Sequence, residues 1–338
     1  MNPVTAALVI GIAGALAFNF TNGFHDSSNA VAGLVATRSA GPVQAVTLAA
    51  VFNVLGPLLA GTAVANTIGG ILVIQPRHTL ALVGAALTGA LAWNIVTWWR
   101  GLPSSSSHAL VGGLVGAGVV EAGFGAVRWG GLRGIHPFGV LGVLASLAIS
   151  PVLGFAVGFV TQRLAHRGLA RARREVARPI RGGVWAAAAA LAFSHGANDG
   201  QKTMGVITLM LLAAGQVSTF SVPLWVILAS ALSLTIGTAF GGWRIVRTLG
   251  SGIYRLRPLD GFLMEADSAV IILAAALVGG PVSTTHVVAS SVAGVGAGQR
   301  WRHVRWPLVA DIGLAWLITI PASAIIASLA LPLWRLFA

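Results

Sequence analysis

Long apolar runs alternate with short polar or basic segments along almost the whole chain. A helix of about 20 apolar residues crosses the roughly 30 Å hydrocarbon core of a membrane, so each run predicts a membrane span. The expected spans are 3–36, 43–65, 79–99, 103–120, 138–160, 184–214, 223–242, 263–280, 282–298 and 306–331. The first and the sixth are long and are expected to be broken, the first near Asn22. No soluble domain remains between the spans.

The composition supports a chain that lives in lipid. Of the 338 residues, 56% are hydrophobic and 9% are charged, and the mean hydropathy is +0.85. Too few polar groups remain to coat a soluble globule. The absence of cysteine excludes disulfides and thiolate metal sites. The apolar N-terminus lacks the basic head of a signal peptide and is expected to form the first span.

The net charge of +13 comes from arginines spread over the segments between spans. Their densest stretch, Arg163 to Arg181, predicts a basic cytoplasmic linker at 162–183 between an N-terminal repeat at 1–161 and a C-terminal repeat at 184–338. Five crossings per half then place both termini outside, in a multi-pass protein of the plasma (inner) membrane. This scatter of charge reflects membrane topology and argues against a nucleic-acid partner.

Two motifs each occur once in both halves. Phe18–Asp26 parallels Phe193–Asp199, and Pro103–His108 parallels Pro281–His286. An odd number of crossings per half turns the second copy upside down, as in the inverted repeats of many transporters. The predicted fold is therefore an all-α polytopic membrane protein with two inverted repeats, broken helices, re-entrant-like hairpins and about ten to twelve membrane helices.

Asp26 and Asp199 lie inside apolar spans, where an unpaired carboxylate costs at least a few kcal/mol. A substrate-binding or coupling role is favoured, and the alternative is that neighbouring donors satisfy them merely to break a helix. The binding candidates around them are Asn22, Asn29, His195, Asn198 and Lys202. Lys202 is the only lysine, and the sequence leaves open whether it pairs with Asp199 or contacts an anion directly.

The segments after Pro103 and Pro281 have the pattern of sharp helix starts. Proline is tolerated in a first helical turn, hydroxyls cap free N–H groups, and a free helix N-terminus attracts anions. Two opposed starts would offer donors to a tetrahedral oxyanion from both sides, whereas the alternative is ordinary capping and helix packing. The candidate substrate ligands are Ser105, Ser106, Ser107, Ser283, Thr284 and Thr285.

Four further residues are candidates for carrying a proton or a coupling ion, beside Asp26 and Asp199. They are His108, His286, Glu265 and Asp267. A histidine in a membrane span also occurs as a packing residue, and the two carboxylates also fit a place near the inner boundary of the membrane.

With these residues in hand, the sequence resembles the PiT family of inorganic phosphate transporters. The family's duplicated motif looks like Asn22–Ala30 and His195–Asp199, and its hairpin segments look like the two serine-rich and threonine-rich starts. The resemblance implies that Asp26 and Asp199 are coupling residues, that the hydroxyl residues lie near phosphate, and that a functional glutamate stands at Glu265.

The resemblance also implies a coupling mode. Sodium-coupled members carry a glutamate in the second span where this chain has Asn53, which disfavours sodium. The strings around Asp26 and Asp199 are most similar to the bacterial low-affinity branch, which implies import of a neutral divalent metal–phosphate complex together with protons. Asp26 and Asp199 would then contact Mg²⁺, Zn²⁺, Ca²⁺ or Mn²⁺ with the phosphate, and no cofactor is permanently bound.

Several alternatives stay open at this point. A sodium-coupled phosphate symporter and a sulfate permease share the expected fold, and a passive anion channel shares the hydroxyl-rich helix starts. An intramembrane hydrolase is disfavoured because the adjacent Ser107 and His108 cannot face each other on a helix, so the chain is not expected to be an enzyme. Phosphate and the lipid bilayer are the expected partners, and a homodimer is left open.

Overall fold

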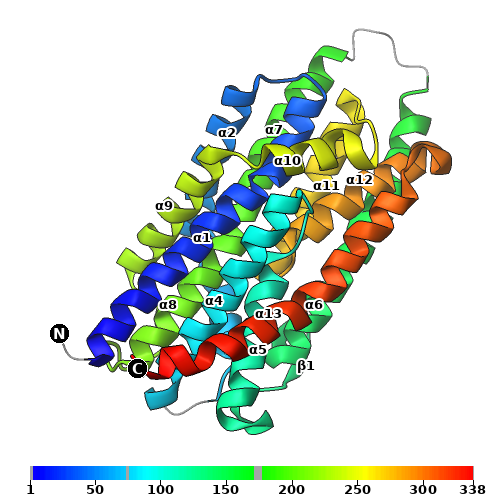
Figure 1. Ribbon diagram of the computed structural model, residues 1–338. Helices are drawn as coiled ribbons and strands as arrows, with labels where there is room; N and C mark the ends of the chain where they lie inside the picture. Colours follow the sequence, from blue (N-terminus) through cyan, green and yellow to red (C-terminus); the bar gives the residue numbers. More distant parts are fainter. Residues whose placement is uncertain (1–2, 74–75, 171–176, 338) are drawn as a thin grey trace.

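Helices run side by side along one long axis in the computed structural model, which describes residues 3–73, 76–170 and 177–337 (Figure 1). The first half contains α1 (Pro3–Ala36), α2 (Pro42–Leu59), α3 (Ala63–Gly69), α4 (Pro76–Arg100), α5 (Ser106–Ala122) and α6 (Gly139–Gly168). The second half contains α7 (Ala177–His195), η3 (Gly196–Gly200), α8 (Gln201–Ala213), α9 (Leu224–Phe240), α10 (Trp243–Arg247), η4 (Thr248–Ile253), α11 (Pro258–Leu277), α12 (Thr284–Arg300) and α13 (Trp306–Arg335).

Within the described residues, five helices are long and apolar enough to cross a membrane, namely α1, α2, α4, α6 and α13. A sixth candidate is α9 together with α10 and η4, which are bent by 63° at the break between them. Leu317 and Leu329 of α13 are largely exposed, as expected for side chains that face lipid. The predicted class, an all-α membrane protein with broken helices, is confirmed. The inverted relation of the two repeats stays a prediction.

The expected break of the first span near Asn22 is wrong, because α1 is one continuous helix. The glycine there serves close packing instead. A Cβ atom added to Gly23 would lie 2.1 Å from the carbonyl oxygen of Leu234 on α9, and one added to Gly237 would lie 2.1 Å from the carbonyl oxygen of Phe20. Helices α1 and α9 therefore touch backbone to backbone, as small residues allow in membranes.

The sixth expected span has a π-helical turn where a break was predicted, and its backbone stays helical throughout. Helix α7 ends at His195, a single π-helical turn (η3) follows, and α8 continues from Gln201. Gly196 lies against α2, where an added Cβ would come within 2.5 Å of the Asn53 carbonyl oxygen. Such π turns are common at functional sites, because they change which side chains face the interior.

The two expected helix starts begin inside the bundle. Ser105 caps α5 by accepting a hydrogen bond from the His108 amide at 3.2 Å, and Ser283 caps α12 through the His286 amide at 3.2 Å. Helix α4 packs against α5 and α11 against α12, so each start follows a reversal of the chain. The first residues of α5 and α12 are buried, which places both N-termini in the protein interior.

Helices extend into the predicted linker from both sides. Helix α6 continues to Gly168 and α7 begins at Ala177, while residues 171–176 lie outside the described residues. The boundaries of the linker stay a prediction. A small hairpin that the sequence analysis did not anticipate, β1 (Gly131–Arg133) and β2 (His136–Phe138), pairs Gly131 with Phe138 in antiparallel register before α6.

The contact between α1 and α9 predicts how a methyl group added at Gly237 changes the stability of the protein. Gly237→Ala should destabilise the protein by about 1–3 kcal/mol, because the added Cβ meets backbone that cannot rotate away. Thermal unfolding of the purified protein in detergent measures this loss. Gly182→Ala on α7 is the control, since nothing lies within 4 Å of its added Cβ. An unchanged unfolding temperature for Gly237→Ala would contradict the packing.

Candidate functional site

Two carboxylates from the two halves of the chain face one another in the interior. Asp26 comes from α1 and Asp199 from η3, and each residue is only 1% exposed. Thr284, at the start of α12, lies between them, with its Oγ1 atom 3.5 Å from Asp26 Oδ2 and 3.3 Å from Asp199 Oδ2. The duplicated motif therefore brings its two aspartates into a single buried cluster.

Asp26 is surrounded by donors from three helices. Thr285 Oγ1 donates to Asp26 Oδ1 at 2.9 Å, and Ser106 Oγ lies 3.4 Å from Asp26 Oδ2. The preceding residue, His25, donates from Nδ1 to Asp26 Oδ1 at 2.8 Å. Asn29 supports this arrangement indirectly, because its Nδ2 donates to Thr285 Oγ1 at 3.1 Å. Most of these groups are hydroxyls or ring nitrogens that could also serve an incoming anion.

Asp199 has a formal cation as its partner. Lys202 Nζ lies 2.6 Å from Asp199 Oδ1 and 2.8 Å from the Val282 carbonyl oxygen, and it also donates to Ser107 Oγ. Asn22 Nδ2 donates to Asp199 Oδ2 at 3.3 Å. In this structure Lys202 therefore pairs with Asp199, the first of the two roles that the sequence left open.

Helices α5 and α12 begin at this cluster, so the positive ends of their dipoles lie beside the two carboxylates. Ser106 and Thr284 are the first residues of these helices, and their hydroxyls contact the central carboxylates. Ser105 and Ser283 instead cap the two helices. The cluster thus combines hydroxyl donors with two helix starts, which is a suitable environment for an oxyanion.

Three predicted residues border the cluster. Asn198 Nδ2 donates to the Gly280 carbonyl oxygen at 3.0 Å and so fixes the chain before α12. The rings of His108 and His286 lie 4.5 Å apart, one from each serine-rich or threonine-rich motif, and His286 stacks on Trp316 at 3.8 Å. These histidines form the side of the cluster that faces α13.

Glu265 and Asp267 lie outside the cluster. Glu265 Oε1 accepts a hydrogen bond from the Leu34 amide at 3.2 Å, and Leu34 is two helical turns, or about 12 Å, from Asp26 along α1. Asp267 Oδ2 accepts one from Thr161 Oγ1 of α6 at 2.6 Å. Both carboxylates therefore bind other elements of the bundle, and their predicted role in coupling stays a prediction.

Two sets of contacts around the cluster were not predicted from the sequence. Asn53 of α2 was noted only as a departure from the family pattern, yet its Oδ1 lies 3.0 Å from His195 Nδ1. Thr97 and Ser104 lie 3.4 and 3.5 Å from His25 Nε2. Asn53 was detectable as a single polar side chain in an apolar span, whereas the other two contacts depend on how α4 packs against α1.

One group of side chains in the described residues has the spacing of metal ligands. The ligand atoms of Asp26, His195 and Asp199 all lie within 4.8 Å of one another, and all three residues are buried. Two carboxylate oxygens and one imidazole nitrogen form a donor set that divalent cations accept.

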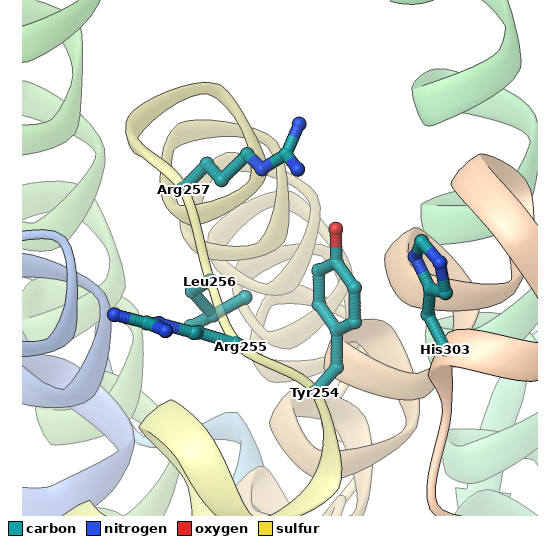
Figure 2. Close-up of a pocket in the computed structure, with 5 residues that line it drawn as sticks. All are labelled: Tyr254, Arg255, Leu256, Arg257 and His303. Carbon is teal, nitrogen blue, oxygen red and sulfur yellow. The ribbon is translucent and has the colours of Figure 1, made fainter.

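An open cavity of about 380 Å³ lies at one end of the bundle (Figure 2). Tyr254 stands between Arg257 and His303, and Arg255 points away from them. Burial and the nearby Asp260 carboxylate raise the pKa of the Tyr254 phenol. Because α12 has 17 residues between its buried start and this end, the cavity is about 25 Å from the carboxylate cluster.

The fold and the cluster together define a class of protein. Charged groups buried among membrane helices, beside interrupted helices and interior helix starts, are the features of a membrane transporter. The chain belongs to the phosphate transporter family, whose model matches residues 22–327. The predicted family is thus confirmed, and the family and the relatives described next are transporters, not enzymes.

Similar proteins cover nearly the whole chain. A probable low-affinity inorganic phosphate transporter of Rhizobium meliloti is 42% identical over 325 residues, which are 95% of each chain. One of Bacillus subtilis is 38% identical and covers 94% of this chain and 93% of its own. A solved structure, the sodium-dependent phosphate transporter, has a TM-score of 0.87 at 23% identity over 98% of this chain and 99% of its own, and it shows the same fold.

The ion pair between Asp199 and Lys202 predicts that the effects of replacing these two residues on stability are not additive. Lys202→Met should destabilise the protein by about 3–5 kcal/mol, because Asp199 is then left as an uncompensated buried charge. The double variant Lys202→Met/Asp199→Asn removes both charges and should recover most of this loss. Thermal unfolding of the four proteins of this double-mutant cycle, in buffer free of phosphate and divalent cations, measures the coupling. Additive losses would contradict the pairing.

Proposed function

We propose that this protein is a secondary active transporter that imports inorganic phosphate as a neutral complex with a divalent metal, together with protons. The observation that carries the proposal is the pair of buried carboxylates, Asp26 and Asp199, placed directly at the starts of α5 and α12. The names of the relatives, which are probable low-affinity inorganic phosphate transporters, favour the same substrate.

The hydroxyl groups supply the part of the site that would recognise the anion. Ser106, Ser107, Thr284 and Thr285 come from the two helix starts and already contact charged groups of the cluster. Hydroxyls can rotate to donate to phosphate oxygens once those contacts are released. An aspartate can also accept the remaining O–H of hydrogen phosphate, which sulfate lacks, and this favours phosphate over sulfate.

Two carboxylates beside an anion require a cation. Phosphate would repel Asp26 and Asp199 in a low-dielectric interior unless a metal or protons lay between them. A divalent ion held by one oxygen of each aspartate and by phosphate oxygens removes that repulsion. This requirement supports a metal–phosphate complex as the transported species.

The net charge of the cluster supports the binding of one further positive charge in each transport cycle. With neutral histidines, the two aspartates and Lys202 leave a net charge of −1, and a neutral metal–phosphate complex does not change it. A proton or a monovalent cation would bring the loaded site to neutrality, the least costly state for burial. Asp26 is the natural acceptor, because Asp199 already has Lys202.

Sodium is the specific alternative to the proton. The solved structure of the same fold is named a sodium-dependent phosphate transporter, although at 23% identity it supports the fold alone. Asn53 beside His195 places a neutral amide where a carboxylate would add a negative charge and favour another cation. The neutral amide therefore supports the proton.

We expect the central basic segment on the cytoplasmic side and both termini outside. The chain has no cysteine, so single cysteines report the topology directly. A cysteine at the exposed Ala170 should react with a membrane-impermeant maleimide only after cells are permeabilised, whereas one at the exposed Leu336 should react in intact cells. The cysteine-free chain is the control. The reverse pattern of labelling would overturn this orientation.

Uptake of radiolabelled phosphate into proteoliposomes tests the proposed function. An inward proton gradient with Mg²⁺ should drive uptake without sodium, and Asp26→Asn and Asp199→Asn should both reduce it to the level of empty liposomes, because each removes a charge that the loaded site needs. Asp311→Asn is the matched control, since Asp311 is an exposed carboxylate on α13 and should leave uptake unchanged.

Each other outcome of this assay has a defined meaning. Strict dependence on sodium would replace the proton by sodium as the coupling ion. Uptake that is independent of divalent cations would remove the metal from the transported species. An absence of phosphate uptake under every gradient would overturn the assignment as a phosphate transporter.

A further inference from the structure

The ring of His195 is held between an amide on one side and a carboxylate on the other. Its Nδ1 atom lies 3.0 Å from Asn53 Oδ1, and its Nε2 atom lies 3.3 Å from Asp199 Oδ2. The side chain is fully buried. A neutral imidazole carries its proton on one of these nitrogens, and the hydrogen-bond partner of each nitrogen decides which one.

The contacts of Asn53 favour the proton on Nδ1. Asn53 Nδ2 donates to Thr238 Oγ1 at 2.9 Å, and the Thr238 hydroxyl is 3.0 Å from the Leu234 carbonyl oxygen, to which it donates. The amide oxygen of Asn53 therefore faces the ring as an acceptor. His195 Nδ1–H donates to it.

A proton on Nε2 would be poorly satisfied. Among the described residues, His195 Nε2 has no hydrogen-bond partner of acceptable geometry, although Asp199 is close. An Nε2–H would face Asp199 Oδ2 at 3.3 Å in poor geometry, so it would form a weaker hydrogen bond than Nδ1–H forms with Asn53 Oδ1 at 3.0 Å. In the favoured tautomer, the lone pair of Nε2 faces the cluster beside two carboxylates.

Close packing holds this ring in place. An added Cβ at Gly196 would lie 2.5 Å from the Asn53 carbonyl oxygen, and one at Gly56 would lie 2.3 Å from the Phe193 carbonyl oxygen. Helix α2 thus contacts the backbone on both sides of His195. The amide and the ring have little freedom to separate, which is the condition for a fixed ligand.

We propose that His195 Nε2 is a ligand, with Asp26 and Asp199, of the cation that accompanies phosphate, and that Asn53 is the positioning residue that keeps Nε2 free of a proton. This inference rests on the proposed function in one respect, since it takes the cation to be transported together with phosphate. The 3.3 Å between Nε2 and Asp199 Oδ2 matches the separation of two tetrahedral ligands that are each about 2.0–2.1 Å from a metal.

An imidazole ligand changes which metals the site accepts. Nitrogen ligands suit Zn²⁺ and similar transition metals, whereas Mg²⁺ and Ca²⁺ prefer sites made of oxygen. The site should therefore bind Zn²⁺ or Co²⁺ in preference to Mg²⁺, and Asn53 should contribute to that preference without touching the metal.

Metal binding to the purified full-length protein in nanodiscs, without phosphate or any gradient, tests this inference. Partners that orient a histidine ligand typically contribute 10–100-fold to metal affinity, so Asn53→Leu should weaken Co²⁺ binding by about that factor and Mg²⁺ binding much less. His195→Gln should have the same selective effect. Asn53→Asp keeps an acceptor toward Nδ1 and should restore Co²⁺ binding.

Asn19→Leu is the matched control. Asn19 is a buried amide whose Nδ2 donates to the Ser230 carbonyl oxygen on α9, and within the described part of the chain it makes no hydrogen bond to the cluster. Its replacement should change neither affinity. Equal weakening of Co²⁺ and Mg²⁺ by Asn53→Leu would assign Asn53 a merely structural role and overturn the inference.

The tautomer is tested directly on the unaltered protein. In ¹⁵N-histidine-labelled protein, with His195 identified by its absence in His195→Gln, Nε2 should be unprotonated and should shift when Zn²⁺ is added. A protonated Nε2 that does not respond to Zn²⁺ would overturn the inference. Because these measurements need no phosphate, a failure of phosphate uptake with intact selective metal binding would reject the proposed function and leave this site standing.

Discussion

The cost of burying charge in an apolar helix bundle is the constraint on which the site depends. An isolated carboxylate in a low-dielectric interior costs several kcal/mol, so each must find a partner within the protein or accept one from outside. Asp199 finds Lys202 at 2.6 Å, whereas Asp26 has hydroxyls and His25 but no permanent cation among the described residues. Asp199 therefore has a formal cation as its partner, whereas the donors around Asp26 are hydroxyls and an imidazole.

The helices are arranged to bring those partners together. Glycines let α1 approach α9, and α2 approach α7, at backbone distance, so short side chains such as Asn53 reach across the interface. The interior starts of α5 and α12 supply hydroxyls and amides without any long side chain. The same few contacts between helices therefore provide both the close packing and the partners of the buried charges.

Much of this arrangement follows from the sequence, for identifiable reasons. The duplicated motifs identify Asp26 and Asp199 as site residues. The Pro-Ser and Pro-Val-Ser patterns predict two helix starts, because capping chemistry is local, and the structure places them at Ser106 and Thr284, three residues after each proline. The continuity of α1 was not predicted. A glycine such as Gly23 signals either a break or a close contact, and only the position of α9 distinguishes them.

Contacts between distant segments account for the other differences. The coupling role of Glu265 stays a prediction, but no local pattern indicates that α11 packs its carboxylate against the backbone of α1 at Leu34, outside the cluster. The pairing of Asn53 with His195 joins residues that are 142 positions apart. No local pattern encodes such a pair, since its geometry depends on how α2 and α7 pack.

The two copies of the first motif are not equivalent, and the difference bears on coupling. At matched positions the first copy has Asn22 and His25, whereas the second has His195 and Asn198, so histidine and asparagine exchange places around the aspartate. His25 donates Nδ1–H to Asp26, while His195 turns toward Asp199 an Nε2 that has no hydrogen-bond partner among the residues that the structure describes. Asp199, Lys202 and His195 thus form a side of the cluster that is already neutralised and offers a nitrogen ligand. Asp26, whose neighbours are hydroxyls and the His25 ring, is the side where an additional positive charge changes the balance. In the proposed cycle, Asp26 therefore has two roles, as one ligand of the metal and as the place of the additional positive charge, whereas His195 and Asp199 serve the metal alone.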